Sequence, residues 1–303
     1  MASQVVPKMG LFELIGLVPL AQRTSGRPEI TVGLVDGPIA FDHPDLAGQR
    51  IREIAASVPA RCVDRGSAAC AHGTFVAGIL AAKRRSVAPA ICPDCTFLLR
   101  PIFSETSSLH QGTPATTSEE LAAAIIDSVE AGVRILNLSV NVTGASRKGE
   151  SRLADAFEFA ASRGVLPVAS AANQGGYAAS MLTRHPWVLP VLATDYMGRP
   201  LPNSEFSAVV GRRGIAAPGK GIVSLGTNDE PCSLSGTSAA TAVVTGSIAL
   251  LWSELPDARA AEVRFVVANP SSRRRSSLVP PMLNAWSAFQ ALAKTSAHRA
   301  FVN

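Results

Sequence analysis

The 303-residue sequence is poor in aromatic and in charged side chains, which make up 5% and 17% of it. Hydrophobic residues account for 47%, and this excludes a disordered chain, because such chains bury too little apolar surface to fold. The core must therefore be built largely from small and aliphatic residues, which suit helices packed closely on a parallel sheet. The length allows one large α/β domain or two small ones.

The sequence also lacks a long apolar run, and we expect no signal peptide at its start. Its apolar stretch near the start, Leu11 to Leu20, is interrupted by Glu13 and is not followed closely by a small-residue cleavage site. No run reaches the roughly 18 apolar residues that a membrane span needs. We expect residues 11–20 to form an amphipathic helix or a buried segment of a soluble, cytoplasmic protein that does not bind membranes.

Aromatic residues are not interleaved with the basic ones, although the net charge is +5. The basic residues are scattered or lie in two short runs, Lys83 to Arg85 and Arg273 to Arg275. Nucleic-acid modules combine basic patches with aromatic side chains, so the sequence does not predict a nucleic-acid partner. We expect the two runs to lie in solvated loops.

The cysteine count is odd, which argues against a fully paired secreted framework. The five cysteines are Cys62, Cys70, Cys92, Cys95 and Cys232. A four-cysteine zinc site would need its first pair more closely spaced. A thiol redox function for the C-x-x-C pair would need it at a helix start, whereas Pro93 lies within the pair and the strand-like Thr96 to Leu99 follows it. We expect free thiols in a reducing compartment and no metal.

Short apolar runs rich in β-branched residues alternate with helical patterns along the chain. This alternation predicts an α/β fold, a doubly wound, mostly parallel sheet with helices on both faces. We expect one domain over residues 1–303, with residues 1–28 as an N-terminal extension. The expected strands are Ile30–Val35, Val133–Leu138, Val165–Ala169 and Val188–Leu192. The expected helices are Leu121–Ala131 after a start at Ser118, Arg152–Arg163 closed by Gly164, and Asn284–Ala293. The expected loops are Ser104–Thr117 and Ser271–Pro281.

Two reactive side chains lie next to glycines in the first third of the chain. Asp36 ends a predicted strand, where a carboxylate can orient an imidazole. His72 opens a helix of small residues and can act as a base toward a hydroxyl. Taken singly, Asp36-Gly37 is a common turn and His72 a helix-start histidine without a task.

Two further candidates lie in the second half of the chain. Ser238 opens an apolar helix, and its N–H points with the positive end of the helix dipole toward any developing oxyanion. Asn173 follows a predicted strand shortly after its end, where its amide can donate to the same oxyanion. Taken singly, each is better explained as a capping residue.

The order Asp, His, Ser, with an Asn between His and Ser, is the chain order of subtilisin. The sequence resembles the subtilase family over Glu29 to Ala293. The segments similar to family signature blocks are Val35-Asp36-Gly37, His72-Gly73-Thr74, Gly236-Thr237-Ser238 and Ile215 to Gly219.

The resemblance implies a subtilisin-like serine endopeptidase without a cofactor, acting on a peptide or protein. In it, Ser238 attacks the scissile carbonyl, His72 acts as base and then acid, and Asp36 holds the imidazole. The Ser238 N–H and the Asn173 side chain would bind the oxyanion. The substrate would add as an extended strand beside the candidate substrate-binding residues. These are Ser139, Val140, Asn141, Ser170 and Ala171.

The sequence departs from typical secreted subtilisins at several positions, none of which removes a catalytic group. Asp36 is followed by Gly-Pro rather than Ser-Gly, and Phe75 stands where a second histidine is common. Asn141 and Ala172 replace glycines, and Ala242 replaces a proline. Asn141 is expected to narrow the primary specificity pocket.

Two segments are shorter than in many relatives. Lys83 to Pro89 leaves no room for the family's calcium loop, so we expect no calcium there. Met1 to Glu29 is too short for the usual pro-domain, so we expect folding without an intramolecular chaperone.

The Asp-Gly-Pro turn, the cysteine-bearing stretch before Pro101 and the block at Ile215 are most similar to subtilases that mature ribosomal peptides, such as the cyanobactin proteases. Our hypothesis is cleavage of a dedicated precursor peptide in the producing cell. One alternative is a macrocyclase, in which an amine resolves the acyl-enzyme, although the helical insertion usual in such relatives is not evident. Another is a non-catalytic peptide-binding pseudoprotease, against which the intact triad argues.

Overall fold

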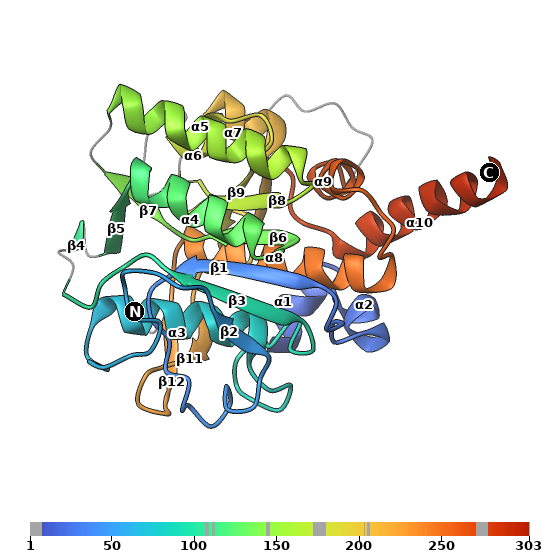
Figure 1. Cartoon of the computed structure of the whole chain (residues 1–303). Coiled ribbons are helices and arrows are strands. Elements are labelled where there is room, and N and C mark those ends of the chain that lie inside the picture. Colours follow the sequence, from blue (N-terminus) through green and yellow to red (C-terminus); the bar gives the residue numbers. More distant parts are fainter. Residues whose placement is uncertain are drawn as a thin grey trace.

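The computed structural model describes residues 8–106, 109–110, 113–143, 146–171, 180–202, 204, 207–270 and 278–302. Helices and strands alternate along most of the chain (Figure 1). The helices are α1 (Lys8–Leu14), α2 (Val18–Arg23), α3 (Ala68–Ala81), α4 (Ser118–Glu130), α5 (Arg147–Ser162), α6 (Met181–Arg184), α7 (Ala208–Arg213), α8 (Thr237–Glu254), α9 (Ala260–Ala268) and α10 (Ala285–Val302). The strands are β1 (Thr31–Asp36), β2 (Ile51–Glu53), β3 (Thr96–Pro101), β4 (Leu109–His110), β5 (Thr113–Thr117), β6 (Ile135–Leu138), β7 (Asn141–Thr143), β8 (Leu166–Ser170), β9 (Leu189–Thr194), β10 (Ile215–Pro218), β11 (Ile222–Leu225) and β12 (Pro231–Leu234).

A seven-stranded sheet in the order β10-β9-β8-β6-β1-β3-β2 forms the centre of the molecule. All its neighbouring strands pair in parallel. β1 lies between β6 and β3, so the strand order reverses beside it. The predicted doubly wound parallel sheet is confirmed. In such sheets, binding and catalytic sites gather at the carboxyl ends of the strands next to the reversal.

Helices cover both faces of this sheet. α8 packs on β6, β8, β9 and β10 and against α3, whereas α4 and α5 pack together on the opposite face (Figure 1). Successive strand residues point to opposite faces, so Leu34 joins the core under α8 and Val35 joins the core under α4 and α5. Burial on both faces explains why the strands read as continuous apolar runs.

The segment 11–20 buries one side and exposes Glu13 and Leu14, as an amphipathic segment should, but it forms parts of two short helices instead of one. Leu11, Ile15, Leu17 and Leu20 are all at most 2% exposed. The chain turns between α1 and α2 at Gly16, whose φ of 62° is in the left-handed region that favours glycine. None of the helices in the described part of the chain has the length and apolar character that a membrane crossing requires.

Three expected boundaries are wrong. Ser104–Thr117 is not all loop, because it contains β4 and β5, and β5 pairs in parallel with β7. α5 begins at Arg147, since Ser146 caps it by accepting a hydrogen bond from the Gly149 N–H at 2.9 Å. α10 continues beyond Ala293 to Val302. Of the other expected loop, residues 271–277 lie outside the described part, and 278–281 belong to no named helix or strand.

The expectation that all cysteines are free is also wrong. Cys62 and Cys70 form a disulfide, because the chain between them folds back and brings their Cα atoms to 5.5 Å. Cys92 and Cys95 are buried thiols at the start of β3, and Cys232 is a partly exposed thiol on β12. Among the described residues, the one group with metal-ligand spacing consists of Cys62, Cys70 and Glu105. The four-cysteine zinc site is therefore not assembled.

Trp252 is the largest fully buried side chain of α8, and its Nε1 donates to the carbonyl of Ala258 at 2.8 Å. We expect Trp252→Ala to lower the free energy of unfolding by about 3–5 kcal/mol, because the cavity and the loss of a buried hydrogen bond add to the lost burial. Urea unfolding measures this, with the partly exposed Trp286→Ala as a control that should lose much less. A loss below about 1 kcal/mol for Trp252→Ala would contradict the packing described here.

Candidate active site

Asp36 is the last residue of β1, and its side chain is 1% exposed. β1 pairs with β6 in a register that matches Val35 with Leu138. Asp36 and Ser139 are the next residues along these two chains, so they reach the carboxyl edge of the sheet at the same level. This edge, beside the strand-order reversal, is where the fold favours a site.

His72 lies in the first turns of α3 and touches Asp36 directly. The distance between His72 Nδ1 and Asp36 Oδ1 is 2.6 Å, and the Gly37 N–H donates to the same oxygen at 2.7 Å. An ionised carboxylate only accepts hydrogen bonds, so Nδ1 carries the proton and Nε2 carries the lone pair of the neutral ring. The His72 side chain is 13% exposed. The geometry presents an imidazole ready to accept a proton at Nε2.

Glycine is required on both sides of this contact because α3 passes very close to the turn after β1. A Cβ atom on Gly37 would lie 2.2 Å from the carbonyl oxygen of Ala69. A Cβ atom on Gly73 would lie 2.4 Å from the carbonyl oxygen of Pro38. The close approach of α3 to the turn after β1 thus explains why a glycine follows both Asp36 and His72 in the sequence.

The pKa of His72 is raised above its ordinary value of 6.5. Burial is the largest single influence and lowers it, but the charge of Asp36 and the hydrogen bond to Asp36 together outweigh burial. The other carboxylate oxygen, Oδ2, is buried and has no hydrogen-bond partner among the described residues. Pro38, the residue after Gly37, has no N–H to offer it, which gives the Gly-Pro departure a physical meaning.

Ser238 is the second residue of α8 and is partly exposed. Its backbone carbonyl accepts a hydrogen bond from Ser139 Oγ at 3.3 Å. The Ser139 hydroxyl accepts from Asn137 Nδ2 at 2.9 Å, and Asn137 Oδ1 accepts from Thr245 Oγ1 at 3.1 Å. This polar chain ties two points of α8 to β6, and it places Ser238 beside the strand that neighbours Asp36.

The candidate substrate-binding residues lie along the same edge. Ser139 and Val140 are buried, and Ser170 donates from its hydroxyl to the Val140 carbonyl at 3.3 Å. Asn141 opens β7 and pairs with Ala115 of β5. In the order β4-β5-β7, β4 and β7 are the two outer strands among the described residues.

The expectation that the substrate adds as a strand beside Ser170 and Ala171 needs correction. β8 is an interior strand, paired with β6 on one side and β9 on the other. The Ala171 N–H also donates to the Val191 carbonyl at 2.9 Å. Ser170 and Ala171 therefore flank this edge of the sheet by position, whereas β7 has one side that is not paired with a strand of the described residues. Asn173 and Ala172 lie outside the described residues.

Sequence reasoning missed Phe103 and the partners of Ser139. The Phe103 ring meets the His72 ring edge-on, with centroids 6.4 Å apart, and so restricts its tilt. Asn137 and Thr245 are fully buried polar residues of β6 and α8. An asparagine in the otherwise apolar Ile135–Leu138 was a usable signal, since a buried polar group needs a partner.

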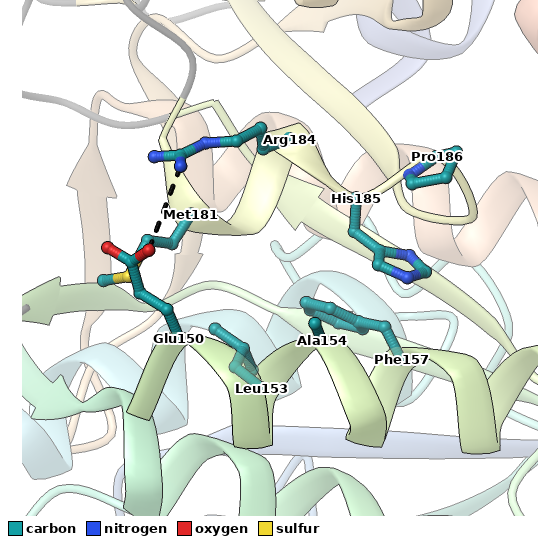
Figure 2. A pocket seen from close by; sticks show the side chains of 8 residues that line it. All are labelled: Glu150, Leu153, Ala154, Phe157, Met181, Arg184, His185 and Pro186. Carbon is teal, nitrogen blue, oxygen red and sulfur yellow. Dashed lines mark ion pairs between the residues drawn. The ribbon is translucent and has the colours of Figure 1, made fainter. Parts of the chain in front are cut away.

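A separate cavity of about 290 Å³ lies between α5 and α6 (Figure 2). Its apolar wall includes Leu153, Phe157 and Met181, and an ion pair between Arg184 Nη1 and Glu150 Oε2, 4.0 Å apart, spans it. None of the candidate active-site residues lines this cavity.

Comparison with known proteins agrees with this geometry. The model of the Subtilase family matches residues 27–292. Fervidolysin of Fervidobacterium pennivorans is 27% identical over 285 residues, which are 85% of this chain and 39% of fervidolysin. A mutant of the protease domain of PatA is 30% identical, with a TM-score of 0.79 over 89% of this chain and 97% of that one. The prenylagaramide maturation protease PagA is 28% identical, with a TM-score of 0.78 over 91% and 98%. The chain thus spans nearly all of the two solved structures but well under two thirds of fervidolysin.

We expect the pKa of His72 to lie above 6.5 in the wild type and below 6.5 in Asp36→Asn, because burial of the ring remains when the charge is removed. An NMR titration of the histidine ring signals measures both values, and His72→Gln assigns the His72 signal. Equal pKa values in the two proteins would contradict the electrostatic account.

The same pair makes a prediction about stability. A raised pKa in the folded state stabilises the fold fully below pH 6.5, and this contribution is lost as the pH rises through the folded pKa. Asp36→Asn should therefore cost more stability at acidic than at alkaline pH.

Proposed function

This chain belongs to the subtilase family, and from that premise we propose that it is a serine endopeptidase with Ser238 as nucleophile, His72 as general base and Asp36 as its partner. The observation that carries the proposal is the 2.6 Å contact between Asp36 and His72 at the edge where Ser238 is held. A buried carboxylate, an oriented imidazole and a serine at a helix start are the groups that acyl transfer requires.

In the proposed reaction, the Ser238 hydroxyl oxygen attacks the scissile carbonyl carbon while its proton passes to His72 Nε2. Asp36 stabilises the imidazolium that forms. The imidazolium then gives the proton to the leaving amine, the C–N bond breaks, and an ester to Ser238 remains. Water attacks this ester with His72 again as base, which releases the carboxylic acid and restores the serine.

Stabilisation of the oxyanion is proposed for two donors. The Ser238 N–H lies at the N-terminus of the 18-residue α8, where free N–H groups and the helix dipole favour negative charge. The Asn173 side chain is the second proposed donor, by resemblance to the family. A substrate strand pairing with the outer edge of β7 would pass Asn141.

For the substrate class, we propose a dedicated precursor peptide. Support comes from the similarity to PagA and to PatA, which are a prenylagaramide and a patellamide maturation protease. The outer strand β7 is only three residues long, Asn141–Thr143. A short edge favours a substrate whose chain is already extended and accessible, and disfavours a folded protein.

We expect a fluorophosphonate to add once to the wild type, because His72 activates a single serine, and not at all to Ser238→Ala. Intact mass measures the adduct. Ser235→Ala, in the same motif, serves as a matched control and should still be labelled. A labelled Ser238→Ala protein, or an unlabelled wild type, would refute the assignment of the nucleophile.

Asn173→Leu should lower kcat by about 10²–10³, since one oxyanion donor is lost.

We expect kcat/KM for a candidate precursor peptide to exceed that for unfolded casein by at least about tenfold, with one cleavage site. Mass spectrometry of the products locates the site and also separates linear from cyclic products. Equal cleavage of both substrates without site preference would mean that the protease is a general one.

A further inference from the structure

The Cys62–Cys70 disulfide joins a surface loop to the helix that carries His72. Cys70 is fully buried in the first turn of α3, two residues before His72. Cys62 is partly exposed and lies in the loop that precedes α3. Neither cysteine has a role in the proposed reaction, yet both lie beside it.

The loop that carries Cys62 is attached to the chain that leaves Asp36. The Ile39 N–H donates to the Ala60 carbonyl at 2.9 Å, and the Cys62 N–H donates back to the Ile39 carbonyl at 3.1 Å. Ile39 is only three residues beyond Asp36. The disulfide therefore closes a short path from Asp36, through the loop, to the first turn of α3.

A second attachment comes from the segment that follows Phe103. Glu105 Oε1 accepts from the Val63 and Asp64 N–H groups at 2.9 and 3.0 Å. Since the Phe103 ring meets His72 edge-on, the loop is held between two segments that both contact the Asp36–His72 pair. The loop that carries Cys62 therefore supports the start of α3.

We propose that the Cys62–Cys70 disulfide positions His72 against Asp36 and that its reduction lowers turnover. This inference rests on the proposed function. The close approach at Gly37 and Gly73 leaves α3 no room to move toward Asp36, so a shift is confined to directions that lengthen the contact with His72. Misplacement of a catalytic group by about 1 Å can cost on the order of 10² in rate.

The reduction is a thiol–disulfide exchange with a dithiol reductant. A reductant thiolate attacks the partly exposed Cys62 sulfur, the S–S bond breaks, and the Cys70 thiolate leaves and takes up a proton. The second reductant thiol then displaces Cys62 and closes a cyclic disulfide. Two electrons and two protons have passed to the protein, which now holds two thiols.

The first experiment counts thiols and measures rates. Alkylation of the denatured protein should modify three of the five cysteines before reduction and all five after dithiothreitol treatment. We expect reduction to lower kcat by about tenfold or more, with KM nearly unchanged, and reoxidation to restore it. Rates are taken at a temperature at which the circular dichroism of the reduced and oxidised proteins is identical.

Two variants isolate the cause. The double variant Cys62→Ser, Cys70→Ser should have the low kcat of the reduced enzyme and no response to dithiothreitol. Cys232→Ser removes a thiol outside this path and should keep both the activity and the response.

The acid limb of the kcat/KM profile should also move to lower pH on reduction, because His72 loses contact with the Asp36 charge. A merely structural disulfide would leave that limb in place.

The outcomes separate the two proposals. An oxidised wild type that neither hydrolyses peptides nor reacts with fluorophosphonate refutes the proposed function. An active oxidised enzyme whose kcat changes less than about twofold on reduction overturns the positioning role alone. A double serine variant with wild-type kcat, or five alkylated cysteines before reduction, overturns it equally.

Discussion

The contact between the first turns of α3 and the turn after β1 is the constraint on which the candidate site depends. Backbone meets backbone there, with room for hydrogen atoms alone at Gly37 and Gly73. The approach brings His72 Nδ1 within 2.6 Å of Asp36. The Thr74 hydroxyl strengthens it by accepting from the Ala40 N–H at 3.0 Å. Orientation of the imidazole is thus a result of how a helix and a strand pack.

The position of Ser238 depends on a different device, a buried polar chain through Thr245, Asn137 and Ser139. Each buried group in it has a partner, so breaking one link leaves others unsatisfied in a buried region. Such a chain allows one register between α8 and β6. Ser238 is held by the sheet through this chain, and His72 is held by the close packing at Gly37 and Gly73.

Much of the fold and of the candidate site could be predicted from the sequence, because the signals for it are local. Apolar β-branched runs predicted β1, β6, β8 and β9, and the glycines beside Asp36 and His72 marked the close turn. The missed features depend on distant partners. β5 is a strand because β7 pairs with it, and Cys62 is fixed near Cys70 because Ile39 forms backbone hydrogen bonds with Ala60 and Cys62. The early start of α5 is different, since the Ser146 cap was visible and overlooked.

α8 is buried along its whole length, apart from Ser238 and Glu254. Its small side chains allow the sheet and α3 to pack closely against it. β4, β5 and β7, by contrast, form a separate small sheet, which packs on α3 and α4 through β5. The edge proposed to take a peptide thus belongs to a sheet whose residues can change without altering the close packing of α3 on the turn after β1.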